Sequence, residues 1–437
     1  MVKKISAPAQ TPPAGHPKLG QALSTAICGN DILSSALYVS GIAIAFAGVY
    51  APLVLLMVVG VLWLYKSVYT EVVEALPVNG GAYNCLLNGT SKNFAAVAGV
   101  MTILSYVATA VLSAKVGVEY LHTVVAGIPV IPATIGLLLV FSILVISGIS
   151  DSAKVALGIF CLHVATLIVF CILGYMYLKH GVSQFNINLL ATAGIVAKRG
   201  GVLSALYLAF SASLLGVSGF ESSANFVEEQ QPGVFRKTLR NMLIGVAVFN
   251  PLIAFMVLNS LPFDTIVAAK DFLLASAAQT IGGTVFLYIV VVDAFLVLSG
   301  AVLTSFIGIS GLVSRMANDN CVPVFLKKQN SRGSYPRIVL LFFALCSSIL
   351  IITHGNLLSL AGVYTISFLG VMSFFAIGNL VLKENRPDLK RTYRAPVIKA
   401  GLAFCATFFG ILGNIRIDVN NLHFFELYLF RRCWLFF

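Results

Sequence analysis

Long apolar runs dominate this chain. A helix needs about 20 apolar residues to cross a bilayer, and inside lipid only helices or closed barrels satisfy every backbone group. Apolar residues make up 59% of the chain and charged residues 10%, whereas a typical soluble domain has about 25% charged residues. The pattern predicts an all-α polytopic membrane protein of about eleven helices, expected at 21–48, 52–75, 94–124, 129–148, 153–178, 202–226, 239–260, 280–313, 337–353, 357–382 and 398–414.

The net charge of +12 would suggest a nucleic-acid partner in a soluble protein. In a membrane protein, an excess of Lys and Arg instead marks the cytoplasmic loops. If the expected helices alternate in direction, most loop Lys and Arg fall on the side that holds the N-terminus. We therefore expect a cytoplasmic N-terminus, membrane lipid as surroundings, the plasma membrane as location and no nucleic-acid partner.

No catalytic or metal-binding motif accompanies the apolar runs. The eight cysteines lack the spacing of metal or redox sites and mostly fall inside apolar runs, which is typical of small buried side chains. The HExxH, P-loop and GxSxG patterns are absent. The sequence indicates neither an enzyme nor a cofactor or metal site.

The first apolar run contains polar residues where a lipid-facing helix would have none. Polar groups at this depth persist only in a protein interior or a wet cavity. A glycine followed by Asn, Asp and a serine pair also suits the end of one helix and the start of another. We predict that this helix is broken, with one half ending near Cys28 and the next beginning near Ser34. The residues of interest are Cys28, Gly29, Asn30, Asp31, Ser34, Ser35, Ala36 and Tyr38.

A second copy of this pattern interrupts the helix expected at 202–226. Its residues of interest are Gly216, Ser218, Gly219, Phe220 and Glu221. The two interrupted helices lie five helices apart, as two inverted repeats of five helices predict. The two breaks are then expected to meet antiparallel near the membrane midplane, where secondary transporters bind substrate.

Other ionisable residues stand inside apolar runs. Lys115 and Glu119 are four residues apart on one helix and are expected to pair. Asp293 is expected to face the bundle, with Lys66 or Lys115 as open alternatives for its partner. Such residues are rare in membranes and commonly functional.

Several motifs occur in the order of a known family. These are the turn from Glu74 through Pro77 to Tyr83, the stretch Gly219–Glu221 with Glu228 and Glu229, and the loop from Arg386 to Pro396. They resemble the amino acid–polyamine–organocation superfamily of permeases, whose fold is LeuT-like. The residues from Asp31 to Tyr38 also resemble the first-helix signature of Kup/Kim-type potassium permeases.

This resemblance implies roles for the residues at both breaks. Backbone amides at Ser34–Ala36 would bind a substrate carboxylate, and carbonyls near Gly29 and Gly216 would bind an ammonium. Asp31, Glu221 and His163 would couple transport to a proton or cation; His163 takes the place of a helix 5 lysine in some proton-coupled members. Structural roles stay open: helix packing for both glycines, capping for Asp31, and hydrogen bonding for Glu221 and His163.

Three functions compete. The first is a proton-coupled amino acid or polyamine permease that alternates access around broken helices 1 and 6. The second is a potassium–proton symporter, and the third, a membrane-embedded enzyme or receptor, lacks any visible catalytic or soluble part.

We divide the chain into a disordered cytoplasmic tail (1–20), a ten-helix transport core (21–382), a cytoplasmic loop with helix 11 (383–414) and an atypical tail (415–437), whose end is interpreted as truncation or a gene-model artefact.

Overall fold

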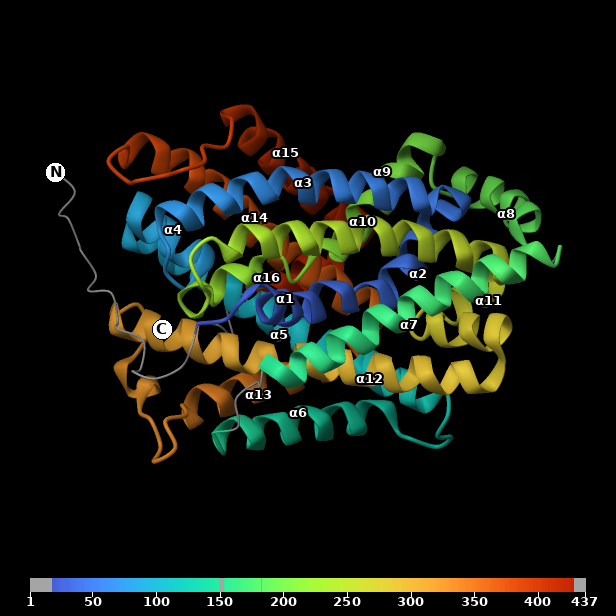
Figure 1. Cartoon of the computed structure of the whole chain (residues 1–437), viewed down its shortest axis with the longest axis horizontal. Helices are drawn as coiled ribbons and strands as arrows, with labels where there is room; N and C mark the ends of the chain where they lie inside the picture. The colour runs from blue at the N-terminus through green and yellow to red at the C-terminus, as the bar shows by residue number, and fades with distance from the viewer. Residues whose placement is uncertain (1–17, 149–152, 182, 428–437) are drawn as a thin grey trace.

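The computed structural model describes residues 18–148, 153–181 and 183–427. Within these ranges the chain is nearly all helical, as predicted, and its long helices lie side by side in one elongated bundle (Figure 1). Within the same ranges, β-type pairing is limited to one isolated bridge between Leu19 and Gln230.

The first half of the bundle begins with the interrupted helix. Its two parts are α1 and α2; the chain then turns at Gly48, where φ is 55°, and returns as α3. The elements of this half are α1 (Gln21–Ser34), α2 (Ala36–Ala47), α3 (Ala51–Ala75), α4 (Gly81–Gly89), α5 (Lys92–His122), α6 (Val130–Ile146) and α7 (Ala153–Lys179).

The second half repeats this order of long helices. A short helix follows the second long helix in each half, α4 in the first and α11 in the second, which agrees with two related repeats. The elements are α8 (Phe185–Lys198), α9 (Val202–Ser213), α10 (Val234–Ser260), α11 (Phe263–Ala268), α12 (Leu273–Asn318), α13 (Pro336–Ile352), α14 (Leu357–Asn385), α15 (Val397–Ile417) and α16 (Val419–Glu426).

Most predicted helices agree with the structure within a few residues. The main difference is α8, which lies where a polar connector was expected. Asn188 on α8 donates through Nδ2 to the carbonyls of Leu258 and Leu261 at 2.7 and 2.9 Å, and Thr192 accepts from the amide of Val49 at 3.1 Å. These long-range bonds hold the connector against the bundle as a helix.

Burial follows the arrangement expected in a membrane. Eight helical segments of the described chain are long and apolar enough to cross a bilayer, and the first of them, 21–75, contains both the first and the second expected helix. α5 and α14 are buried along most of their length, whereas α7 and α15 expose apolar side chains such as Val155 and Ile398. The outer surface is therefore suited to lipid.

Part of each expected tail packs against the bundle. Near the start, the amide of Leu19 donates to the carbonyl of Glu229 at 2.7 Å, so the expected disorder does not hold there; residues 1–17 and 428–437 lie outside the described residues. After α15, α16 turns back against α14. Asn421 is buried, and a Cβ on Gly362 would lie 2.2 Å from its Nδ2. Beside this contact is a cavity of about 20 Å³.

Candidate substrate-binding site

The first interruption is a single residue, Ser35. The helix is interrupted as predicted, but residues 28–34 all remain in α1, and α2 begins at Ala36. Ser35 keeps φ −60° and ψ −26°, and its amide donates to the carbonyl of Ile32 at 3.3 Å. The expectation that the chain unwinds between Cys28 and Ser34 is therefore wrong.

The polar residues of this stretch stay helical because each finds a partner. The Ser34 and Ser35 hydroxyls each donate at 2.7 Å to the carbonyl three residues earlier, and Asn30 Nδ2 donates to the carbonyl of Ala156 on α7 at 2.9 Å. Hydroxyls that bond back to their own helix do not need to unwind it. As a result, two of the three amides predicted to be free for a carboxylate, those of Ser34 and Ser35 but not that of Ala36, are occupied in this conformation.

The second interruption is much longer. α9 ends at Ser213, and the chain forms only three short 3₁₀ turns, 214–217, 221–225 and 227–229, before α10. Gly219 lies at its centre with φ 89°, a region that side chains rarely adopt. A Cβ there would lie 2.9 Å from Asp31 Cγ. Glycine is therefore required where the second interruption rests on α1.

Two buried carboxylates occupy this contact. Asp31 and Glu221 are each 7% exposed and lie close enough for their charges to interact. Ser222 Oγ donates to Asp31 Oδ2 at 2.7 Å, and Ser105 Oγ of α5 donates to Glu221 Oε1 at 3.4 Å. Glu221 Oε2 has no hydrogen-bond partner among the described residues. Such a pair favours a bound cation or proton, because buried charge is costly without a counter-charge.

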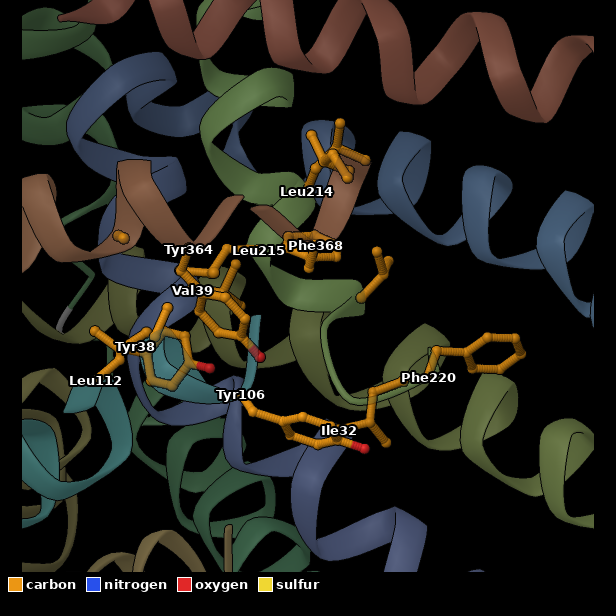
Figure 2. Packing of buried hydrophobic residues seen from close by; sticks show 14 of the residues in the cluster. Ile32, Tyr38, Val39, Tyr106, Leu112, Leu214, Leu215, Phe220, Tyr364 and Phe368 are labelled. Atoms are coloured by element: carbon orange, nitrogen blue, oxygen red, sulfur yellow. The ribbon is translucent and has the colours of Figure 1, made fainter. Parts of the chain in front are cut away.

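Tyrosines from four helices surround Glu221. Each interacts electrostatically with it: Tyr38 of α2, Tyr69 of α3, Tyr106 of α5 and Tyr364 of α14. Figure 2 shows the side chains of Tyr38, Tyr106 and Tyr364 gathered in one region of the core. Ser218 lies beside the hydroxyls of Tyr38 and Tyr364. The carboxylates therefore share their surroundings with several hydroxyl oxygens.

A buried histidine and aspartate connect two further helices to the first interruption. His163 of α7 and Asp293 of α12 are both fully buried, and Nδ1 lies 2.8 Å from Asp293 Oδ2. The other ring nitrogen, Nε2, lies 3.2 Å from the carbonyl oxygen of Leu33, in the last turn of α1. Asp293 therefore faces the bundle as predicted, but its partner is His163.

Lys115 takes part in a different cluster. It pairs with Glu119 at 3.1 Å, which confirms the pairing predicted on α5. It also contacts Asp271, which precedes α12. Lys115 therefore forms its ion pairs with acidic residues on α5 and before α12.

The family model described as amino acid permease matches residues 19–429. The chain belongs to the amino acid permease family. It is a multi-pass membrane transporter of the wider amino acid–polyamine–organocation superfamily, and not an enzyme.

Two bacterial transporters resemble the permease in sequence. The potassium transporter KimA of Bacillus subtilis is 28% identical over 367 residues, which cover 80% of the permease and 59% of KimA. The permease thus matches less than two thirds of KimA's length. The branched-chain amino acid permease BcaP of the same organism is 23% identical over 371 residues, covering 79% of the permease and 76% of BcaP.

A solved structure shares the fold. A manganese transporter of Eremococcus coleocola superposes with a TM-score of 0.62 over 97% of the permease and 92% of that chain, at 13% identity. The permease therefore has the predicted LeuT-like architecture, with interrupted helices 1 and 6.

The predicted site residues of the permease are all buried. His163 lies on α7, and the others lie along α1, at the start of α2 or in the second interruption. The structure brings together Asp31, Tyr38, Ser218 and Glu221. Gly29 lies apart from them, since a Cβ there would meet the Phe160 ring of α7 at 2.3 Å. Sequence analysis missed Ser105, Tyr106, Ser222, Tyr364 and Asp293 as site residues. Two of them carried a local signal: Ser222 belongs to the serine pair that follows Glu221, and Asp293 is an ionisable residue inside an apolar run.

Proposed function

We propose that the permease transports a monovalent cation, potassium in first place, and that Asp31 and Glu221 bind it. The observation that carries this proposal is the buried carboxylate pair where the two interrupted helices meet. Two carboxylates removed from water are strongly destabilised unless a cation or proton compensates them. Hydroxyl and carboxylate oxygens are the ligands that hard cations prefer.

The sequence supports the same cargo. The residues from Asp31 to Tyr38 resemble the potassium permease signature. Asp31 is one of the two buried carboxylates, and the Tyr38 hydroxyl lies near both of them. KimA, described as a potassium transporter, is similar along 80% of the permease. This similarity supports a cation as the cargo.

An amino acid or polyamine is the second candidate. The description of the family and the similarity to BcaP favour it. An amino acid brings its own carboxylate, which needs free donors and would approach Asp31 and Glu221. Since the amides of Ser34 and Ser35 are occupied, a cargo that carries only positive charge, such as a metal cation or a polyamine, fits this conformation better than an amino acid does.

We propose that His163 and Asp293 hold a coupling proton. A carbonyl oxygen only accepts, so His163 Nε2 must carry a proton to bond Leu33. A hydrogen bond between Nδ1 and Asp293 then needs a second proton, on the ring or on the carboxyl. If one of these two protons is lost, two acceptors face each other, either Nδ1 and Asp293 Oδ2 or Nε2 and the carbonyl oxygen of Leu33. That contact then breaks. Proton binding would in this way be linked to the first interruption.

The topology belongs to the same proposal. Residues 21–382 would form the ten-helix transport core, followed by a cytoplasmic loop and helix 11 within 383–414. The N-terminus would be cytoplasmic, which the distribution of Lys and Arg supports, and the location would be the plasma membrane.

Uptake into liposomes that contain the purified protein tests the cargo. Labelled rubidium, as a potassium mimic, and a labelled amino acid mixture are offered separately, each with and without an inward proton gradient. We expect rubidium uptake that rises with the gradient and is lost in Asp31→Asn. Amino acid uptake without rubidium uptake would reject the cation proposal and establish the second candidate.

A further inference from the structure

Four cationic side chains gather at the surface of three neighbouring helices. They are Lys66 on α3, Arg236 and Arg240 on α10, and Lys399 on α15. The charge of Lys66 interacts with the charges of the other three. α3 packs against both α10 and α15, so the four groups belong to one continuous surface. Both arginines are exposed, and both lysines are partly exposed.

No carboxylate neutralises this basic cluster within the described residues. Every ion pair found there involves other cations. The two acids at the end of α3 are engaged elsewhere. Glu71 bonds Arg391 and Lys383 at 3.1 and 3.0 Å, and Glu74 accepts from the amide of Tyr393 at 2.9 Å. Four positive charges therefore face the surroundings without a protein anion.

The basic cluster lies at the border of the lipid-facing surface. Lys399 Nζ lies 3.9 Å above the ring of Trp63, which is 49% exposed, and Arg236 lies 5.6 Å from the ring of Tyr393. One turn further along α10 and α15, Ile244 and Leu402 are exposed. Trp and Tyr concentrate where headgroups meet the hydrocarbon core. The cluster therefore has cations beside aromatic rings, with exposed apolar side chains one turn away, which suits a phospholipid headgroup and its acyl chains.

We propose that this basic cluster binds the phosphate headgroup of an anionic phospholipid. The two arginines can hold phosphate oxygens through paired N–H donors, and the two lysines add point charges. The acyl chains would lie along the exposed apolar side chains of α10 and α15. Basic pockets between membrane helices bind anionic headgroups in this manner. A soluble phosphate would meet the same cations but would gain nothing from the apolar surface.

Lipid titration of the purified full-length protein in detergent tests this site. The thermal unfolding midpoint is followed while phosphatidylglycerol or phosphatidylcholine is added, and native mass spectrometry counts the retained lipid. The wild type is expected to be stabilised by phosphatidylglycerol only. Arg236→Gln/Arg240→Gln should need about 30-fold more of it, since each basic residue near an anionic lipid contributes about fivefold in affinity.

The matched control is Lys179→Gln/Lys198→Gln, which also removes two exposed charges but outside the cluster. It should titrate like the wild type. If the arginine variant does not fold, Lys66→Gln/Lys399→Gln takes its place with the same expectation. Equal stabilisation by both lipids, or unchanged titration in the cluster variants, would overturn the proposal. Inorganic phosphate that displaces phosphatidylglycerol at millimolar concentration would likewise overturn it, in favour of a soluble anion site.

Discussion

The two interrupted helices have similar sequence patterns but lose α-helical structure over very different lengths. Each combines a glycine, a carboxylate and a serine pair, yet only Ser35 leaves the helix in the first, whereas 214–229 are free of α-helix in the second. The glycines explain much of the difference. Gly29 stays helical and packs on Phe160, while Gly219 has φ 89°. A glycine permits an interruption, but the neighbouring helix decides whether it occurs.

The contrast also separates the roles of the two carboxylates. Asp31 is carried by a continuous helix and is held by a hydrogen bond from Ser222. Glu221 lies in a segment of short 3₁₀ turns, and one of its oxygens has no partner among the described residues. The position of the Asp31 carboxylate is therefore fixed, whereas the position of the Glu221 carboxylate can adapt.

The largest effect is expected at Gly219. Gly219→Ala adds an unfavourable φ and a contact with Asp31, which should destabilise the fold by about 3 kcal/mol and abolish uptake. Gly233→Ala is the control: it shares a positive φ, at 79° with ψ −5°, but its Cβ would have open space, so about 1 kcal/mol is expected. Thermal unfolding and uptake measure both. Equal effects would show that the contact with α1 is unimportant.

Asp31→Asn should reduce rubidium uptake about 100-fold while the protein still inserts and folds, because Asn can accept the same bond from Ser222. Ser222→Ala, which keeps the charge, should lower uptake less than tenfold. Uptake assays with an insertion control in the same membranes test the order. Undiminished uptake by Asp31→Asn would remove Asp31 from the transport mechanism.

His163→Gln should flatten the pH dependence of uptake, because glutamine cannot take up and release the proton shared with Asp293. His122→Gln, at the exposed end of α5, is the control and should retain the wild-type profile. An unaltered profile in His163→Gln would assign His163 a purely structural role.

The smallest effect is expected at Ser35. Its hydroxyl donates to Ile32 at 2.7 Å and lies 3.3 Å from the carbonyl oxygen of Gly216, so it links the two interruptions. Ser35→Ala should cost about 1 kcal/mol and lower uptake a few-fold. Ser223→Ala removes a hydroxyl that bonds only its own turn, to Phe220 at 2.6 Å. If both variants behave alike, the link across the interruptions contributes nothing.

The positions of most long helices were predictable from hydrophobic length, and the site only in part. Asp31 and Glu221 were visible because they stand in polar stretches inside apolar runs. Tyr106 and Tyr364 were not, since they lie in long apolar helices that only packing brings together. The partner of His163 is 130 residues away. The small extent of the first interruption depends on a carbonyl of α7 that accepts from Asn30, which no local pattern reveals.

The contact of Asn421 with Gly362 limits which side chain residue 362 can carry. The cavity beside it includes Ile42, one turn along α2 from Tyr38, and has room for about one water molecule. Asn421 Oδ1 has no hydrogen-bond partner among the described residues, and a Cβ on Gly362 would lie 2.2 Å from Asn421 Nδ2. Any side chain at residue 362 would therefore have to displace Asn421 from its place on α14.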